Sequence, residues 1–395
     1  MLAAFGDPGH AFPAIALGRA LAARGHDVML ETWSRWRDHI EREGMRFGGA
    51  PEYLVFPTEK RKLKPYQAAV RASRKTAALI EEFDPDVVVV DILTSAASLA
   101  AQACGRPWVT LVPHVMPVSE PGFPPYSIGA RLPRTPAGRA LWRALEPITR
   151  DGLERGREQL NGARTRVGLA PLEHVHGGIS HELTLVATFP QLEYPRVEPL
   201  PWMRVTGPLL WEQPFGDVEL PPGDAPLVLI APSTSQDPDQ RMLAAALAGL
   251  AGEPVRVLAS TNRRPRARPL SVPDNARLVD WVSYARTMPL CDAVVCHAGH
   301  GTVARAIASG APVVACPAGG DMGENSARVA WAGVGVGLPR RLTTPRGVRL
   351  AVRRVLADAR YRRRARELAD WARRNDGAAT AADALESFAA AAVAA

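Results

Sequence analysis

Residues 293–317 read AVVCHAGHGTVARAIASGAPVVACP, which predicts a strand, a glycine-rich turn, a helix and a second strand. The runs at 293–297 and 312–317 are almost entirely apolar, as in parallel strands that helices cover on both faces. The segment 302–310 between them has the pattern of a helix. The stretch therefore predicts one strand–helix–strand unit of a parallel sheet.

The same alternation extends over the whole chain. Further strands are expected at 2–5, 27–32, 87–91, 108–112, 183–188, 203–207, 227–232, 255–260, 277–282 and 334–338. Further helices are expected at 14–25, 66–82, 95–105, 137–167, 238–251 and 324–332. The predicted fold class is α/β, with two doubly wound parallel-sheet, Rossmann-like domains that face each other across a cleft.

The domain boundaries are expected where this alternation stops and restarts. Residues 208–226 are rich in proline and glycine and have no periodicity, which predicts an interdomain linker. The N-terminal domain is then expected at 1–207 and the C-terminal domain at 227–375. Residues 376–395 are expected to form a helical tail that packs back on the N-terminal domain.

Composition excludes several classes of protein. The chain has 395 residues, 47% hydrophobic and 22% charged, which excludes a disordered or fibrous protein. Its four cysteines form no CxxC pair, so neither a disulfide framework nor a structural zinc cluster is expected. No apolar run reaches the roughly 18 residues of a membrane span, and the chain opens on a strand-like segment. We therefore expect no transmembrane helix, no signal peptide and a cytoplasmic location.

The net charge is +8, and arginines are densest at 340–374. Valines recur at helical spacing in this basic stretch, which predicts a helix with a solvated basic face. A basic surface can also bind nucleic acid or anionic lipid. No nucleic-acid-binding motif accompanies the stretch, so we expect no nucleic-acid partner. A homodimer is compatible with the sequence.

The turn at 297–302, HAGHGT, is a candidate anion site. It opens a helix, whose free backbone N–H groups and positive dipole end attract a phosphate. His297 and Thr302 can add side-chain donors. Glycines also occur in such turns because strand and helix pack closely, so the turn alone leaves both interpretations open.

Two flanking segments favour the anion site over a purely structural turn. DWVSY at 280–284 precedes the turn, and PAGGDMGEN at 317–325 follows it. In order and spacing, the three segments resemble the donor motif of the nucleotide-sugar-dependent glycosyltransferases of family 1, which have the GT-B fold, and particularly the bacterial enzymes that glycosylate macrolides, polyketides and antibiotics. The resemblance implies an inverting, metal-independent hexosyltransferase that uses a nucleotide-sugar as co-substrate and no bound cofactor.

The resemblance also assigns the donor to residues of the C-terminal domain. It implies that Trp281 stacks on the nucleobase, that His297 holds the diphosphate, and that Asp321 accepts hydrogen bonds from sugar hydroxyls. The full donor set is Trp281, Val282, His297, Gly299, Gly301, Thr302, Asp321, Met322, Asn325 and Ser233. From the residues alone, Trp281 could equally be a core residue and Asp321 a cap of the following helix.

Two departures from the family motif bear on the donor. Arg305 stands eight positions after His297, where users of UDP-glucose have a glutamate that binds the ribose hydroxyls. Met322 stands where the family has a glutamine that binds the sugar. A deoxyribose and a deoxysugar need fewer polar partners, so both departures favour a dTDP-deoxysugar.

The loop FGDPGHAFP at 5–13 is similar to the catalytic loop of the same family. His10 follows the first strand, at the edge where doubly wound sheets bind ligands, although a lone histidine there could be structural. The resemblance implies that His10 is the general base. Asp91 ends the strand 87–91 at the same edge and matches the partner aspartate that orients the base.

The acceptor side is less specific. The N-terminal domain offers aromatic and apolar candidates that suit a hydrophobic acceptor, or that simply pack its loops: Phe12, His114, Phe123 and Tyr126.

The triplet 84–86, DPD, has the D-x-D pattern of metal sites in a different glycosyltransferase fold. Because it precedes a strand, we interpret it as a turn at the opposite edge of the sheet and expect no metal site.

The predicted function is transfer of a sugar to a hydroxyl group of a hydrophobic natural product. Three alternatives stay open. The first is a peripheral membrane glycosyltransferase with a lipid-linked acceptor, anchored by the basic stretch at 340–374. The others are a sugar-nucleotide epimerase of the same fold and a non-catalytic partner protein. The presence of both His10 and Asp91 argues against the last.

Overall fold

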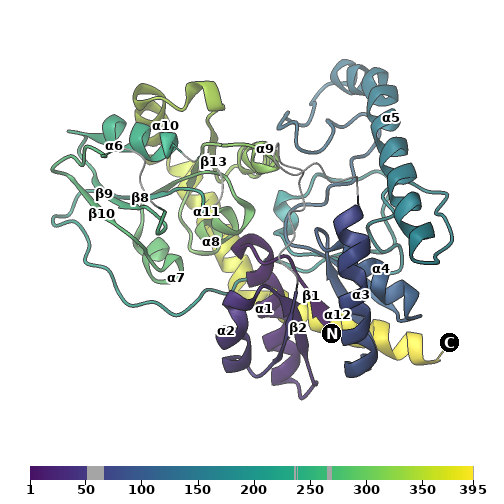
Figure 1. Cartoon of the computed structure of the whole chain (residues 1–395). Coiled ribbons are helices and arrows are strands. Elements are labelled where there is room, and N and C mark those ends of the chain that lie inside the picture. The colour runs from purple at the N-terminus through teal and green to yellow at the C-terminus, as the bar shows by residue number, and fades with distance from the viewer. Residues whose placement is uncertain (51–65, 235–236, 238, 265–268, 395) are drawn as a thin grey trace.

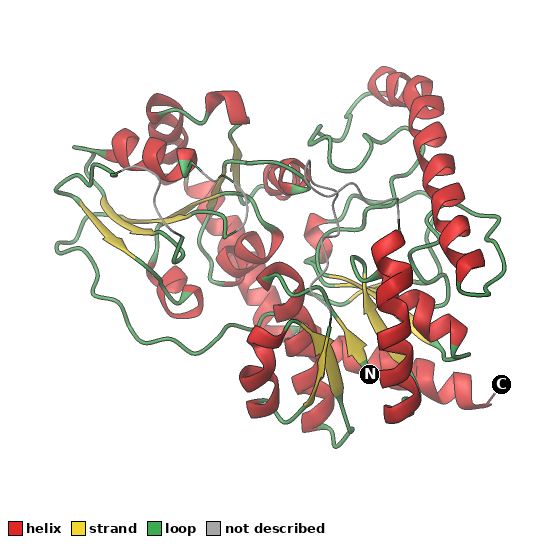
Figure 2. Ribbon diagram, viewed as in Figure 1, coloured by secondary structure: helices red, strands yellow, loops and turns green. Residues whose placement is uncertain are grey.

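The fold is known from a computed structural model, which describes residues 1–50, 66–234, 237, 239–264 and 269–394. Within these ranges the strands form two separate sheets, one of seven strands and one of six, and every pairing is parallel. Figure 2 shows helices packed around both sheets. The predicted fold class, α/β with two doubly wound parallel sheets, is confirmed.

The N-terminal sheet has the strand order β3-β2-β1-β4-β5-β6-β7. Its strands are β1 (Leu2–Ala3), β2 (Met29–Thr32), β3 (Arg46–Gly49), β4 (Val88–Asp91), β5 (Trp108–Val112), β6 (Thr184–Val186) and β7 (Met203–Val205). The helices of this half are α1 (Pro8–Ala23), α2 (Arg37–Arg42), α3 (Gln67–Phe83), α4 (Ser95–Ala103) and α5 (Pro136–Arg166). Short 3₁₀ turns lie at Ser34–Trp36 and Pro190–Leu192.

The C-terminal sheet has the order β10-β9-β8-β11-β12-β13. Its strands are β8 (Leu227–Ala231), β9 (Arg256–Ser260), β10 (Ala276–Val279), β11 (Ala293–Cys296), β12 (Val313–Ala315) and β13 (Gly335–Gly337). Its helices are α6 (Arg241–Leu250), α7 (Tyr284–Thr287), α8 (His300–Ala308), α9 (Met322–Ala332), α10 (Pro345–Ala357) and α11 (Ala359–Arg374), with 3₁₀ turns at Met288–Leu290 and Arg340–Leu342. The last helix, α12 (Gly377–Ala394), follows α11 directly.

Two departures of the local structure from the sequence expectation have a clear physical reason, besides shifts in helix bounds such as that of α1, which begins at Pro8 and so includes His10. β3 has the sequence RFGG, which lacks an apolar run, and it becomes a strand because it pairs with β2 at the edge of the sheet. The basic stretch at 340–374 forms two helices rather than one, because Asp358 ends α10 and its carboxylate accepts the Arg360 amide at the start of α11. The valines of α10 are buried in the core, while Arg353 and Arg354 are exposed.

The chain crosses between the two sheets more than once. Leu209 and Trp211, in the segment after β7, are buried in the core of the N-terminal sheet, whereas Val218 and Leu220 pack on the C-terminal core. Helix α12 then returns and packs against α1 (Figure 1). No helix in the described ranges is both long and apolar enough to span a membrane.

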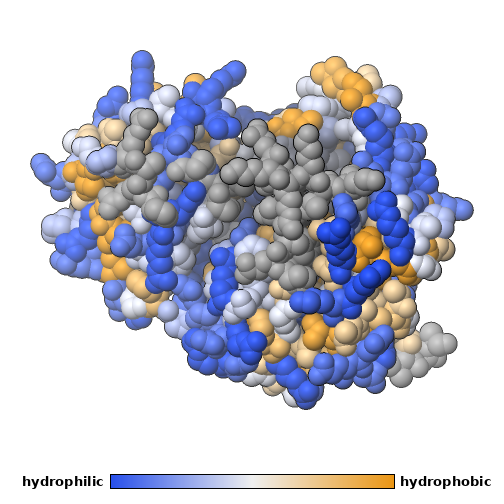
Figure 3. Space-filling view, viewed as in Figure 1, coloured by the Kyte–Doolittle hydropathy of each residue, from blue (hydrophilic) through white to orange (hydrophobic). Residues whose placement is uncertain are grey.

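Most of α5 lies outside either core. Figure 1 places this helix at the upper right, and Figure 3 shows apolar surface there among hydrophilic residues. The exposed apolar side chains of α5 are Leu141, Leu145, Ile148 and Leu153. Only Leu160, Ala163 and Arg164, near the end of the helix, are buried.

The packing of α12 generates a prediction for stability. Leu385 of α12 is 5% exposed in the N-terminal core, so Leu385→Ala should destabilise the protein by about 2–5 kcal/mol through lost burial and a cavity. Arg24→Ala, which removes exposed ion pairs between Arg24 and both Asp383 and Glu386, should cost less than about 1 kcal/mol. Thermal and urea unfolding would compare the two variants. Equal stability of both would contradict a packed tail.

Candidate functional site

The carboxyl edge of the N-terminal sheet brings His10 and Asp91 together. His10 lies in the first turn of α1, and Asp91 is the last residue of β4. His10 Nδ1 donates to Asp91 Oδ2 over 2.7 Å, while Asp91 Oδ1 accepts the Leu93 amide over 2.9 Å. Asp91 is 1% exposed. Because a carboxylate only accepts, Nδ1 carries the proton, and Nε2 of the neutral ring keeps a lone pair.

The environment of His10 favours its protonated form. Burial is the largest single influence on the pKa of His10 and lowers it, but the charge and hydrogen bond of Asp91, with the charges of Asp321 and Asp7, together raise it by more. The resulting pKa lies above the ordinary value of 6.5. His10 can therefore hold a proton that it takes from a bound hydroxyl.

His114 and Tyr126 lie beside this pair. The imidazole of His114 is 6.4 Å from that of His10, between ring centres, and stacks on Tyr126 at 5.7 Å. His114 Nδ1 donates to the carbonyl of Val115 over 2.8 Å. Burial lowers the pKa of His114, so its ring stays neutral near pH 7. The two predicted acceptor residues thus form one wall next to the candidate base.

Two other acceptor candidates lie elsewhere. Phe12 packs edge-on against Trp36 and Trp211, at 5.1 and 4.9 Å between ring centres, where α1 meets the segment after β7. Phe123 packs against Tyr194 at 6.0 Å. The structure therefore shows packing contacts for both phenylalanines, whereas His114 and Tyr126 contact the surroundings of His10.

The glycine-rich turn joins β11 to α8. His297 Nδ1 donates to the carbonyl of Ala231 over 3.2 Å, and Ala298 has a positive φ of 64°. A Cβ at residue 299 would lie 2.3 Å from His297 Nε2, so only glycine allows this imidazole to lie over the turn. At Gly301 a Cβ would meet no atom within 4 Å. Helix α8 begins at His300, two residues earlier than expected, with Thr302 half-buried in its first turn.

Asp321 and Asn325 connect this turn to α9. Asp321 is the N-cap residue of α9, but its side chain caps no helix amide; its Oδ2 instead accepts from Asn325 Nδ2 over 3.1 Å. The same amide group donates to the Ala298 carbonyl over 3.0 Å. The charge of Asp321 also raises the pKa of His10, His114 and His297. Asp321 therefore lies where the carboxyl edges of the two sheets meet.

The remaining donor candidates follow the ends of the C-terminal strands. Trp281 is half-buried just after β10, so it is not a core residue, and Val282 next to it is 1% exposed. Ser233 is buried just after β8. Met322, at the start of α9, is 8% exposed and packs in the hydrophobic cluster beneath that helix.

Several polar groups that the sequence did not single out lie between the sheets. Arg328 of α9 donates to Glu324 Oε1 over 2.7 Å and to the Leu192 carbonyl over 2.9 Å, and its guanidinium stacks on the ring of Tyr194. Both ring nitrogens of His300 are buried without a hydrogen-bond partner among the described residues, and burial lowers its pKa to about 4. In the sequence, the one sign of Arg328 and His300 is that each is a polar residue on the face of its helix that is expected to be buried.

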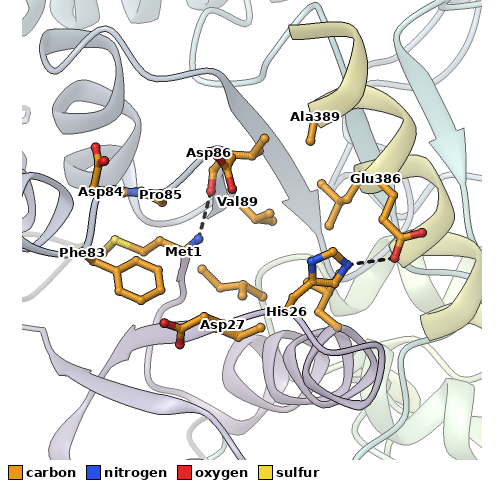
Figure 4. Close-up of a pocket in the computed structure, with 15 residues that line it drawn as sticks. Met1, His26, Asp27, Phe83, Asp84, Pro85, Asp86, Val89, Glu386 and Ala389 are labelled. Carbon is orange, nitrogen blue, oxygen red and sulfur yellow. Dashed lines mark hydrogen bonds and ion pairs between the residues drawn. The ribbon is translucent and has the colours of Figure 1, made fainter. Parts of the chain in front are cut away.

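A cavity of about 310 Å³ opens at the opposite edge of the N-terminal sheet (Figure 4). Asp84 and Asp86 line it, together with His26 and Glu386. Asp84 ends α3 with a φ of 49° and pairs with Arg106, so the D-x-D triplet is the turn between α3 and β4. In the described ranges no group of three or more histidine, cysteine or acidic side chains is placed to hold a metal ion.

Comparison with known proteins places the chain among sugar-transferring enzymes. Residues 1–110 match the glycosyltransferase family 28 N-terminal domain, and residues 241–386 match the erythromycin biosynthesis protein CIII-like C-terminal domain. The chain is 28% identical to 4'-demethylrebeccamycin synthase of Lentzea aerocolonigenes, over 96% of each chain.

Solved structures share the fold. The glycotransferase of kitacinnamycin superposes with a TM-score of 0.74 at 21% identity, over 98% of each chain. The glycosyltransferase VinC, solved in complex with dTDP, superposes with a TM-score of 0.67 at 20% identity, also over 98% of each chain.

The open space at Gly301 generates a prediction. In Gly301→Ala the added methyl would meet no protein atom, so unfolding stability should stay level or rise by about 1 kcal/mol at most. Binding of dTDP should nevertheless weaken, because the methyl would fill the space over the first turn of α8. Gly162→Ala, at an exposed position of α5 and equally free of contacts, is the matched control and should leave binding unchanged. Titration calorimetry and thermal unfolding measure the two effects, and unaltered binding in Gly301→Ala would exclude an anion at this turn.

Proposed function

Because family models of a glycosyltransferase domain and of an erythromycin biosynthesis protein match residues 1–110 and 241–386, we propose that the chain is an inverting natural-product glycosyltransferase of the GT-B fold in which His10 is the general base. Its N-terminal domain, residues 1–207, would hold a hydrophobic acceptor, and its C-terminal domain, residues 227–375, a nucleoside diphosphate sugar. The observation that carries the proposal is the 2.7 Å bond between His10 Nδ1 and the buried carboxylate of Asp91. It leaves Nε2 as the basic atom.

In the proposed reaction, Nε2 of His10 takes the proton of an acceptor hydroxyl as that oxygen attacks the anomeric carbon of the sugar. The bond between this carbon and the diphosphate oxygen breaks, and its electron pair leaves with the diphosphate. Attack from the face opposite the leaving group inverts the anomeric centre. Asp91 does not take the proton; its charge stabilises the imidazolium that forms on His10.

The leaving diphosphate would lie at the start of α8. The free amides and dipole of this nine-residue helix favour negative charge, and His297 lies over the same turn. These groups would stabilise the developing charge without a metal ion. Asp321 would then accept hydrogen bonds from the sugar, between the diphosphate and the base.

The acceptor would lie against His114 and Tyr126. The ring of His114 lies nearly perpendicular to that of His10 and stacks on Tyr126, and both residues stay neutral near pH 7, because burial lowers the pKa of His114 and raises that of Tyr126. Neutral aromatic walls suit an apolar acceptor with few hydroxyl groups.

For the donor we propose dTDP rather than UDP. Arg305, which stands in place of a ribose-binding glutamate, is half-buried on α8. Burial lowers the pKa of Arg305, and the charge of Glu212 raises it. The two oxygens of Glu212 already accept the amides of Tyr284 and Ala285, each over 2.8 Å. A 2′-hydroxyl would therefore find donors here rather than an unoccupied carboxylate. The dTDP complex of VinC supports this choice by likeness of fold.

The catalytic pair is tested by His10→Ala and Asp91→Asn. His10→Ala should lower kcat by roughly 10²–10⁴-fold, while the affinity for dTDP stays unchanged. The base works only when neutral, so wild-type kcat/KM should rise with pH through a midpoint above 6.5. In Asp91→Asn the charge is lost but burial remains, so the pKa of His10 falls and the midpoint should move to lower pH.

His26→Ala is the matched control for the catalytic pair. His26 is an exposed histidine of the same domain, at the opposite edge of the sheet, paired with Glu386 over 2.9 Å. Its removal should leave both kcat and the pH profile unchanged. Turnover in His10→Ala comparable to wild type, or an unshifted midpoint in Asp91→Asn, would refute the assignment.

The donor preference is tested by calorimetry with dTDP and UDP. An unpaired 2′-hydroxyl costs about 1–3 kcal/mol, which is roughly a five- to 150-fold weaker Kd for UDP. Arg305→Glu restores an acceptor and should narrow this difference, whereas Arg19→Glu, which changes a nearby charge on α1, serves as the control. Equal affinities for both nucleotides that Arg305→Glu does not alter would refute the preference and leave the transferase assignment intact.

A further inference from the structure

Arg263 covers the face of Trp281. The guanidinium carbon lies 5.0 Å from the centre of the Trp281 ring and 5.5 Å from that of Phe215. Phe215 approaches Trp281 edge-on at 6.5 Å, from the segment that joins the two sheets. Trp281 is half-buried, and its Nε1 has no hydrogen-bond partner among the described residues. The indole is therefore held by two side chains from other parts of the chain.

A strained turn holds Arg263 in this place. Asn262 and Arg263 both adopt left-handed backbone conformations, with φ of 52° and 57°. Asparagine tolerates this region, whereas it is unfavourable for arginine. The Arg263 amide donates to the Asp280 carbonyl over 2.8 Å, next to Trp281. Asn262 Nδ2 donates to the Pro232 carbonyl over 2.6 Å. Such strain persists where the surroundings enforce it, and it concentrates at ligand sites.

The turn lies at the carboxyl edge of the C-terminal sheet. Pro232 follows β8, Asn262 follows β9 and Trp281 follows β10, and these three strands are neighbours. Ligands of open parallel sheets bind at this edge. Arg263 is exposed, and the structure records no ion pair for its guanidinium within the described ranges. Its charge is therefore not neutralised by a carboxylate of the described chain.

We propose that Arg263 is a further donor-binding residue, whose guanidinium forms the outer wall of the nucleobase slot opposite Trp281. This inference rests on the proposed function, which places the base on Trp281. The planar guanidinium stacks on aromatic rings and on bases alike. The guanidinium covers the indole, and with a nucleotide bound it would cover the outer face of the base.

The distances define the movement that this requires. A base between two planar groups needs about 7 Å from one to the other, since each contact takes about 3.5 Å. The observed 5.0 Å leaves no room for a base, so the guanidinium must move outward by about 2 Å. An exposed arginine has the rotatable bonds to do so.

The test compares Arg263→Ala and Arg263→Lys by calorimetry with dTDP and with inorganic pyrophosphate. Arg263→Ala should weaken dTDP binding about five- to tenfold and leave the pyrophosphate affinity unchanged. Arg263→Lys keeps the charge but loses the planar face, so it should weaken dTDP binding nearly as much. Arg37 of α2 lies over the ring of Phe47 of β3. Arg37→Ala removes this stacked arginine; it is the matched control and should change neither affinity.

The outcomes separate this inference from the proposed function. Unchanged or tighter dTDP binding in Arg263→Ala would overturn the outer wall, and so would full affinity in Arg263→Lys, which would show that charge alone matters. Trp281→Ala tests whether the nucleobase stacks on Trp281. If Trp281→Ala weakens dTDP binding and Arg263→Ala does not, only the role of Arg263 fails. If neither variant changes dTDP binding, the placement of the base on Trp281 fails as well.

Discussion

The guanidinium of Arg328 is the interaction on which the geometry between the two sheets depends. It is 6% exposed, and it joins Glu324 of α9 to the Leu192 carbonyl and the Tyr194 ring of the N-terminal half. Removing one partner of such a buried pair costs about 3–5 kcal/mol, because the other charge stays buried without compensation. The same helix carries Asn325 and follows Asp321, so this anchor also sets where these two residues lie relative to His10 and His114.

The pKa values of the histidines at the meeting edges are shifted in different directions, and this difference suits different tasks. The pKa of His10 lies above its ordinary value because of Asp91, whereas burial lowers that of His114, His297 and His300. Environments that push neighbouring pKa values apart are how one site holds both a base and neutral hydrogen-bonding groups. Among these four residues only His10 has a buried carboxylate as a hydrogen-bond partner, so it alone is prepared to keep a proton.

Each side of the site is built from loops that follow strands, and each loop is fixed by one local constraint. On the N-terminal side, Asp91 uses both carboxylate oxygens and so fixes the imidazole of His10. On the C-terminal side, the missing Cβ of Gly299 leaves the space that His297 occupies, and Asn325 holds the turn at Ala298. The left-handed turn at residues 262 and 263 fixes the surroundings of Trp281. Contacts within the protein hold each of these groups in place.

The sequence by itself determined the two parallel sheets, the glycine-rich turn before α8 and the position of His10 and Asp91 at one edge of the N-terminal sheet. These features depend on local patterns, since apolar runs predict buried strands and parallel strands end at one edge. The contacts of Arg263 with Trp281, of Arg328 with Leu192 and of α12 with α1 were decided only by tertiary structure. Each joins segments far apart in the chain, and an arginine that is buried or stacked has the same local pattern as one in solvent. The local sequence pattern therefore predicts where a strand ends. Only the tertiary structure shows which side chain from a distant segment contacts the residues there.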